Sequence, residues 1–235
     1  CGICMAKCPV KINDDYNKGL AKTKCIRIPF PPAVPAVAII DKDHCIFHQR
    51  GKCRICEKFC EADAIDYGQK EETMELEVGS VILAAGAGEF NAALKDEYGY
   101  KTFPNVVTSI EFERMLSASG PTRGHILRPS DGKEPRRIGF IQCVGSRDIQ
   151  LGKDHEHCSA ICCMQAAKDA IILSEHLRDI QTAVFGMDIR AYGKNFDAFV
   201  ERAQKDHGTR FIRSRISSVE IDPLQDDLIV QYAGN

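Results

Sequence analysis

Cysteine is the residue type in this chain of 235 residues whose number and spacing could do chemistry. There are twelve cysteines, and eight of them lie within residues 1–60. Several are separated by only two or three residues, which suits a shared metal site better than separate disulfides. So many free thiols indicate a reducing compartment, and we therefore expect a cytoplasmic protein.

The first run of cysteines opens the chain with Cys1, Cys4 and Cys8, and Pro9 follows it. This pattern, Cys-x2-Cys-x3-Cys-Pro, equals the last three cysteines of the bacterial ferredoxin run, whose fourth cysteine binds the other of two clusters. The first cysteine of such a run would lie upstream of Cys1. We therefore expect the chain to be part of a longer polypeptide.

A second run follows with the spacing Cys-x7-Cys-x2-Cys-x3-Cys, formed by Cys45, Cys53, Cys56 and Cys60. By the cross-over rule of two-cluster ferredoxins, its first three cysteines bind one [4Fe–4S] cluster together with Cys8. Cys60 then binds a second cluster with Cys1, Cys4 and a ligand further upstream. The alternative is a pair of four-cysteine zinc sites in an interaction module. Cys25 fits neither run and is predicted to be a buried free thiol.

A third group, spaced Cys-x14-Cys-x3-Cys-Cys, is formed by Cys143, Cys158, Cys162 and Cys163. Its first member follows a predicted strand, and the others begin a predicted helix. In a dinucleotide-binding unit this turn carries Gly-x-Gly-x-x-Gly, but Gly145 is the only glycine within residues 143–148. The helix N-terminus favours an anionic thiolate cluster instead. Incidental buried cysteines or a zinc site are the alternatives, and His155 and His157 are predicted to be exposed loop residues.

The remaining pattern predicts the elements that position these cysteines. Residues 1–70 form a cysteine-rich domain with little helical periodicity, and residues 71–235 alternate between strand and helix patterns. We expect a loop over 117–135, helices over 159–178 and 195–207, and strands over 75–86, 137–142, 181–188, 210–213, 217–221 and 227–232. This order is typical of a parallel sheet with crossover helices. The strand over 75–86 is expected to be buried.

Charge and hydropathy exclude several partners. The chain has 31 basic and 33 acidic residues, so its balance does not indicate binding to nucleic acid. No apolar run reaches the ~20 residues that a membrane-spanning helix needs. We therefore expect no direct membrane span.

Four stretches of the chain resemble HdrA, the family of heterodisulfide reductase A-subunits: Pro29–Pro35, Arg137–Asp148, Cys158–Met164 and Met187–Gly193. The resemblance implies an α/β protein in which a ferredoxin-like two-cluster α+β insert joins part of a thioredoxin-reductase-like Rossmann domain of the FAD/NAD type. It also implies that the third cysteine group holds a third [4Fe–4S] cluster close to FAD. Ala84, Ala85 and Gly86 are similar to an Ala-Thr-Gly turn that touches FAD in related flavoproteins, with alanine in place of the threonine.

The function that this resemblance implies is that of an oxidoreductase component that relays electrons between FAD and [4Fe–4S] clusters, with flavin-based electron bifurcation. The implied partners are ferredoxin, other subunits of the heterodisulfide reductase type, and a hydrogenase or formate dehydrogenase subunit. A rival is the related subunit of a quinone-interacting membrane-bound oxidoreductase, which shares these motifs. A pyridine-nucleotide oxidoreductase like the small subunit of glutamate synthase would need a nicotinamide glycine fingerprint, and we find none.

Overall fold

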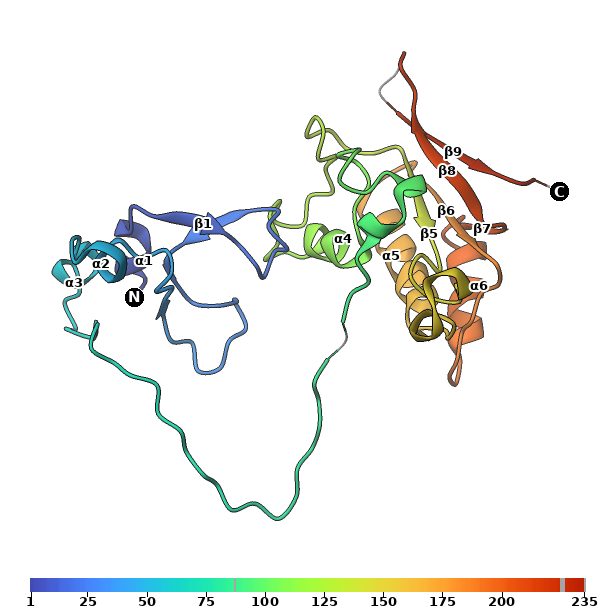
Figure 1. Cartoon of the computed structure of the whole chain (residues 1–235). Helices are drawn as coiled ribbons and strands as arrows, with labels where there is room; N and C mark the ends of the chain where they lie inside the picture. The colour runs from blue at the N-terminus through green and yellow to red at the C-terminus, as the bar shows by residue number, and fades with distance from the viewer. Residues whose placement is uncertain (87, 225–226, 235) are drawn as a thin grey trace. The chain divides into compact units, whose positions relative to one another are not determined.

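The computed structural model describes residues 1–86, 88–224 and 227–234 (Figure 1). The chain is a mixed α/β protein with small sheets. It divides into two compact units. The first contains the described residues up to 86 together with 119–121, and the second contains the rest. None of the helices among the described residues is long and apolar enough to cross a membrane.

The first unit consists of very short elements placed beside the cysteines. Its helices are α1 (Ile3–Lys7), α2 (Ile46–Arg50) and α3 (Ile55–Lys58), and its antiparallel strand pairs are β1 (Lys11–Asn13) with β2 (Lys22–Lys24) and β3 (Ile26–Arg27) with β4 (Ile39–Ile40). Helices and strands of this length are unstable in isolation. The buried core is also small, with Cys8, Cys25 and Ile26 at its centre. Such a unit needs a further constraint to hold its fold, and bound metal supplies one in many small domains.

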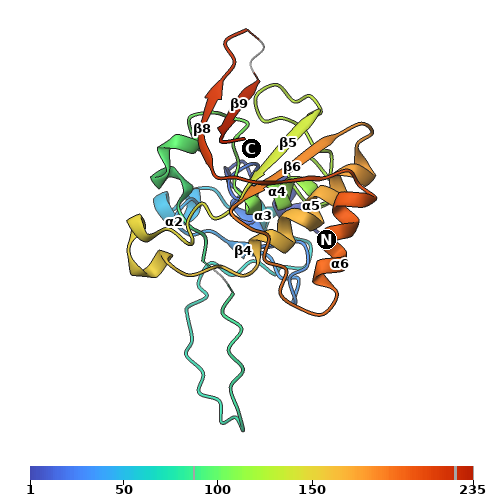
Figure 2. The same ribbon diagram turned by 90° about the vertical axis from the view of Figure 1, so that its right-hand side faces the viewer.

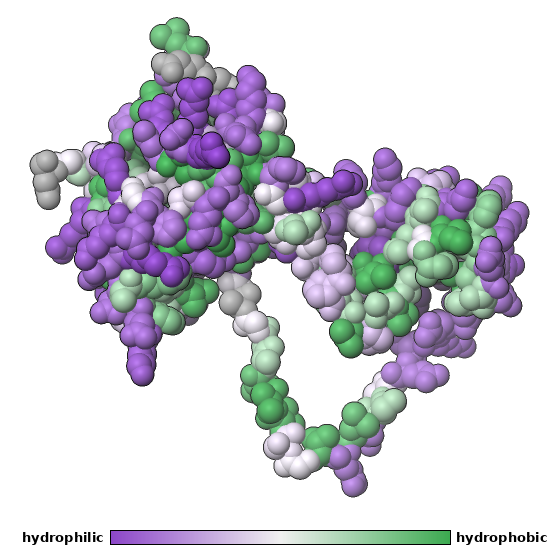
Figure 3. Space-filling model, turned by 180° about the vertical axis from the view of Figure 1, so that it is seen from behind, coloured by the Kyte–Doolittle hydropathy of each residue, from purple (hydrophilic) through white to green (hydrophobic). Residues whose placement is uncertain are grey.

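The prediction of a buried strand over 75–86 is wrong for this structure. The segment is extended but pairs with no strand among the described residues. Its apolar side chains point into solvent, with Ile82 89% and Leu83 90% exposed. They are visible as the green atoms of the extended, solvent-surrounded segment in Figure 3. The physical reason is that a strand needs a neighbour for its backbone N–H and C=O groups, whatever its side-chain pattern favours.

The second unit contains the predicted parallel sheet. Its strands β5 (Arg137–Ile141), β6 (Gln181–Gly186) and β7 (Arg210–Arg213) are parallel and adjacent in that order. The crossover helices are α5 (Cys162–His176) and α6 (Phe196–Lys205), which lie side by side (Figures 1 and 2). Helix α5 begins three residues later than predicted. Ala160 just before it has a positive φ of 64°, which is incompatible with a right-handed helix.

The register of the sheet separates its two faces. Phe140, Val184 and Phe211 are aligned across the three strands, and Phe211 packs against α5 and α6. The neighbouring row contains Ile141, Phe185 and Ile212. This row packs against Tyr98 and a separate antiparallel pair, β8 (Ile216–Ile221) with β9 (Leu228–Tyr232). Alternation along each strand therefore buries both faces of the sheet.

One longer helix, α4 (Ser109–Leu116), was not predicted. Thr108 and Glu111 form a capping box at its start, because the Thr108 side chain accepts from the Glu111 N–H (3.2 Å) while the Glu111 carboxylate accepts from the Thr108 N–H (2.7 Å). The Thr-x-x-Glu pattern was the available sequence signal. As predicted, residues 117–135 contain no helix or strand. The described part of this unit also contains four short 3₁₀ turns: Ala92–Leu94, Asp96–Tyr98, Ile149–Leu151 and Lys153–His155.

Helix α5 carries a buried carboxyl group on the side that faces α4. The Asp169 side chain is only 1% exposed, and Lys168 Nζ lies 3.2 Å from its Oδ1 atom. That oxygen nevertheless lacks a well-aligned hydrogen bond. Burial, reinforced by the nearby Glu113 carboxylate, raises the pKa of Asp169 to about 7.

Candidate metal centres

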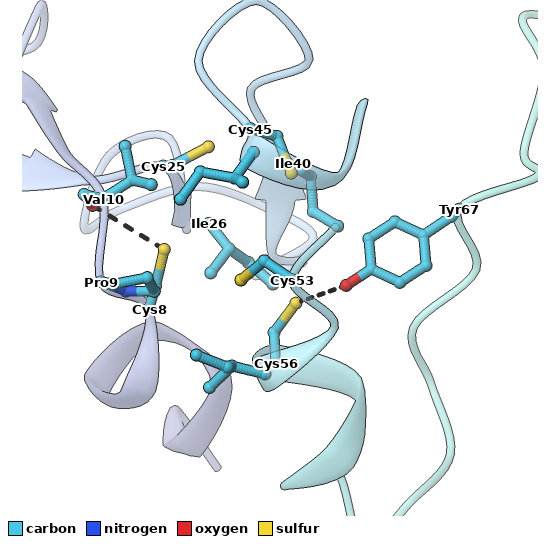
Figure 4. Close-up of a pocket in the computed structure, with 12 residues that line it drawn as sticks. Cys8, Pro9, Val10, Cys25, Ile26, Ile40, Cys45, Cys53, Cys56 and Tyr67 are labelled. Carbon is cyan, nitrogen blue, oxygen red and sulfur yellow. Dashed lines mark hydrogen bonds between the residues drawn. The ribbon is translucent and has the colours of Figure 1, made fainter. Parts of the chain in front are cut away.

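Five cysteines of the first unit line one cavity, and four of them belong to the two ferredoxin-type runs: Cys8, Cys45, Cys53 and Cys56 (Figure 4). They come from three separate places, namely the end of α1, the start of α2 and the stretch around α3. This is the set that the cross-over rule assigns to one cluster. Cys25 lines the same cavity, although its spacing matches neither run.

Local backbone structure explains how these cysteines meet. The Cys8 N–H donates to the carbonyl oxygen of Cys4 (3.1 Å), and Pro9 then prevents continuation of the helix. The Asp41 carbonyl oxygen accepts from the Cys45 N–H (3.0 Å), and the Asp41 N–H donates to the carbonyl oxygen of Cys25 (3.0 Å). These two bonds through Asp41 thus join the Cys45 turn to Cys25, which also lines the cavity.

Cys53 adopts a strained backbone conformation, with a positive φ of 76°. Glycine or asparagine takes this left-handed region at lower cost, and strain of about 1–3 kcal/mol persists only where the surroundings enforce it. A strained cysteine at such a position is explained if its sulfur atom is needed as a metal ligand. Cys143 in the second unit has the same feature, with φ 60°.

The walls of the cavity are otherwise mainly apolar, with Val10, Ile26, Ile40, Ile46 and Ile55 among them. Such a lining keeps water away from bound metal and influences the reduction potential of a cluster. Five cysteines in one cavity bring together several soft sulfur donors, the ligand type that iron–sulfur clusters and zinc prefer. The donor set therefore fits a thiolate-bound iron–sulfur cluster or zinc.

Cys25 differs chemically from the other four. It is 2% exposed, and its thiol donates to the Asp41 carbonyl oxygen (3.2 Å). Burial, together with the neighbouring Cys45 and Cys8, raises the pKa of Cys25 to about 12. The predicted burial of Cys25 is confirmed, whereas its role as a free thiol stays a prediction. The other four are favoured as ligands because their spacing matches the two ferredoxin-type runs, which Cys25 does not.

The cysteines predicted to bind the second cluster are only partly assembled. Cys4 packs against the core formed around Cys8, Cys25 and Ile26. Cys1 is exposed, whereas Cys60 is half-buried and its sulfur accepts from the Ala64 N–H (3.3 Å). Helices α1 and α3, which flank these residues, pack together.

Throughout residues 1–86, 88–224 and 227–234, no three His, Cys, Asp or Glu side chains converge on the position of one metal ion. A four-iron cluster makes a different demand. Each of its four thiolates binds a different iron, so the sulfur atoms surround a space rather than a single point.

The third cysteine group lies at the carboxyl end of β5, where the chain crosses to α5. Cys143 comes two residues after the strand, Cys162 and Cys163 begin the helix, and Cys158 lies in the loop before it. Cys143 and Cys163 are buried, and Cys158 and Cys162 are half-buried. Electrostatic interactions link Cys143 to both Cys158 and Cys162, and Cys163 to Cys162, so the structure brings all four together.

Hydrogen-bond donors surround Cys162 in particular. The Cys163 thiol donates to its sulfur, the Ser159 hydroxyl does so at 3.3 Å, and the Cys143 and Cys163 N–H groups add to them. These donors outweigh the effect of burial and lower the pKa of Cys162 to about 5. The donor role of Cys163, together with burial, raises its own pKa. These donors therefore favour the thiolate form of Cys162, which is the form that binds metals.

Further residues surround this site, and the sequence analysis did not single out Arg147 or Arg190 among them. The Arg147 side chain interacts with Cys143 and makes an ion pair with Asp188, which follows β6. The Arg190 backbone N–H donates to the Cys163 sulfur. His155 was predicted to be exposed, but it is half-buried, because its Nδ1 atom bonds to the Gly145 carbonyl oxygen (2.8 Å) and its ring packs on Phe90. His157 is exposed, as predicted.

The predicted flavin contacts lie in an exposed segment, unlike the cysteines of the third group. Ala84, Ala85 and Gly86 are exposed and lie at the end of the extended segment described above. Gly86 has a positive φ of 78°, which suits a tight turn. No sheet among the described residues supports this turn, and the role of these three residues in flavin binding stays a prediction.

No protein-family model matches the chain. Several known proteins are nevertheless similar to it over nearly its whole length. The iron–sulfur A-subunit of CoB–CoM heterodisulfide reductase from Methanocaldococcus jannaschii is 47% identical over 231 residues, which is 98% of this chain and 34% of that protein. The A-subunit of the H2:CoB–CoM heterodisulfide,ferredoxin reductase from Methanothermobacter marburgensis is 44% identical over 95% of this chain and 33% of its own length. The H2/formate-dependent counterpart from Methanococcus maripaludis is 44% identical over 98% of this chain and 34% of its own length.

The chain thus spans about one third of the length of the curated relatives that it matches. The similarity runs through both units, because it extends over at least 95% of the chain in each of these relatives. Over that third, the chain is similar to A-subunits of heterodisulfide reductases, at 44–47% identity in these relatives.

Proposed function

We propose that this chain is the electron-relay part of an oxidoreductase polypeptide of the heterodisulfide reductase type. In this proposal Cys8, Cys45, Cys53 and Cys56 bind one [4Fe–4S] cluster. The observation that carries it is the common cavity of these four cysteines, which arise from two separate sequence runs. Two further clusters belong to the same proposal, one at Cys1, Cys4 and Cys60 and one at the third cysteine group.

The residues around each site define what the protein contributes. A [4Fe–4S] cluster exchanges one electron at a time, at a potential set by its ligands, its hydrogen bonds and its exposure. The apolar walls of the first cavity limit the access of water to it. At the third cysteine group, the Arg147 guanidinium brings a positive charge and the backbone N–H groups bring positive partial charges. Two such different surroundings favour two different potentials, as a directional relay requires.

The domain organisation proposed here is a ferredoxin-like two-cluster region over 1–70, followed by part of a thioredoxin-reductase-like Rossmann domain over 71–235. The parallel β5–β6–β7 sheet with crossover helices α5 and α6 supports the second assignment. In open α/β sheets, ligands bind beyond the carboxyl ends of the strands, which supports the location of the site. There the third cysteine group replaces a nucleotide-binding turn.

The names of the relatives suggest the redox partners. They mention hydrogen, formate and ferredoxin together with the CoB–CoM heterodisulfide. We propose that the intact polypeptide exchanges electrons with ferredoxin and with a hydrogenase or formate dehydrogenase subunit. FAD and bifurcation are also proposed, on the resemblance alone. The flavin content of the intact polypeptide tests this part.

The relay itself is tested by stepwise reduction of the intact polypeptide, purified without oxygen and followed by electron paramagnetic resonance. We expect signals of reduced four-iron clusters that appear at two or more distinct potentials and disappear on reoxidation. A protein that binds zinc at these cysteines would accept no electrons there, and the proposal would fail.

A further inference from the structure

Tyr67 lies against the first cavity and touches one of the proposed ligands. Its hydroxyl oxygen is 2.9 Å from Cys56 Sγ. Figure 4 shows the ring on the side of the cavity opposite Cys8, with the hydroxyl directed at the Cys56 sulfur. The tyrosine follows the second cysteine run by seven residues, so no spacing rule indicates it.

Neighbours of the ligands hold this ring in place. The Phe47 ring, two residues after Cys45, lies 4.0 Å from the Tyr67 ring, centroid to centroid. The Arg54 guanidinium lies over both rings, 5.6 Å from the Phe47 centroid and 5.7 Å from the Tyr67 centroid. Aromatic and cation–π contacts of this kind fix an orientation as well as contributing stability. The hydroxyl is therefore directed at Cys56 by packing against two residues that lie within the second cysteine run.

The chemistry of a bound cluster determines the direction of the hydrogen bond. Cys56 has no proton when it binds iron, so its sulfur can only accept. A tyrosine hydroxyl has an ordinary pKa near 10 and keeps its proton at neutral pH. The Tyr67 O–H is therefore the donor and Cys56 Sγ the acceptor.

Reduction adds negative charge to a cluster and its thiolates, and a donor to the sulfur stabilises that charge. We propose that Tyr67 raises the reduction potential of the cluster at Cys8, Cys45, Cys53 and Cys56 through its hydrogen bond to Cys56. This rests on the proposed function. Hydrogen bonds to the sulfur atoms are among the factors that set such potentials. Arg54 contributes less directly, because its guanidinium is paired with the Glu57 carboxylate.

The test is Tyr67→Phe in the intact polypeptide, which removes the hydroxyl and keeps the ring. We expect unchanged iron and sulfide per chain and a lower potential for one cluster. The expected change is about tenfold in the equilibrium constant for reduction, or about 59 mV for one electron. Tyr16→Phe is the matched control, because that ring packs on Phe30 and does not line the cavity. It should leave every potential unchanged.

Other outcomes overturn the inference in distinguishable ways. Equal potentials in Tyr67→Phe and the unchanged protein would show that the hydrogen bond has no effect on the cluster. Loss of about four irons in Tyr67→Phe would make Tyr67 a structural residue. Zinc without sulfide in the unchanged protein would instead remove the proposed function, and this inference with it.

Discussion

Replacing single cysteines of the first cavity separates ligands from bystanders. Cys8 and Cys25 are both buried and line the same cavity, but only Cys8 belongs to a cysteine run. Cys8→Ser removes one of four thiolates, and we expect the intact polypeptide to lose one cluster, or about four irons and four sulfides per chain. Cys25→Ser should retain all of them.

The structure also gives the scale of the effect at Cys25. A serine hydroxyl there can still donate to the Asp41 carbonyl oxygen, the acceptor of the Cys25 thiol. The substitution then mainly places a more polar group in an apolar site, at a cost of about 1 kcal/mol in the free energy of unfolding. The assay is iron and acid-labile sulfide per chain, with thermal unfolding measured in parallel. Iron loss in Cys25→Ser with retention in Cys8→Ser would refute the ligand assignment.

Three further predictions concern the second unit, each made in the intact polypeptide. Cys162→Ser should remove about four irons while the signals of the other two clusters persist; loss of all signals would contradict separate sites. Asp169→Asn should stabilise the unit at pH 8 but change little at pH 4. The folded-state pKa of about 7 exceeds the ordinary value of an aspartate. Ionisation of the buried carboxyl group therefore lowers the free energy of unfolding of the wild-type unit as the pH rises from about 4 to 7, by about 1.4 kcal/mol per pKa unit. Unfolding curves of both proteins at pH 4 and pH 8 measure this difference. An equal change in the free energy of unfolding at the two pH values would contradict the argument from burial of Asp169. Thr108→Ala should cost about 1 kcal/mol by removing the capping box, whereas Thr102→Ala, outside any helix, serves as its control.

Residues with a strong local pattern were predictable from the sequence. Strands β5, β6 and β7 and helices α5 and α6 follow from runs of apolar residues and from their alternation. The second strand pair, β8 with β9, was expected as strands, but its antiparallel pairing outside the parallel sheet was not. The segment over 75–86 has an equally strong strand pattern and forms no strand here, because pairing depends on a neighbour that a pattern does not supply.

For the candidate sites too, some parts were predictable from the sequence and others were not. Cysteine spacing predicts which four cysteines share the first cavity, since the cross-over rule relates two distant runs. Spacing could not indicate Tyr67, Arg147 or the positive φ of Cys53, because these depend on how loops pack in three dimensions. The surroundings that adjust a metal site are therefore visible only in the structure.

The clustered cysteines hold iron–sulfur clusters in the function proposed here, and metal content tests this most directly. The measurement is the amount of iron, acid-labile sulfide and zinc in the intact polypeptide, purified without oxygen. We predict at least about twelve irons per chain with an equal amount of sulfide, enough for three four-iron clusters at these cysteines. Zinc without sulfide would contradict the proposed relay and would leave a zinc-stapled module.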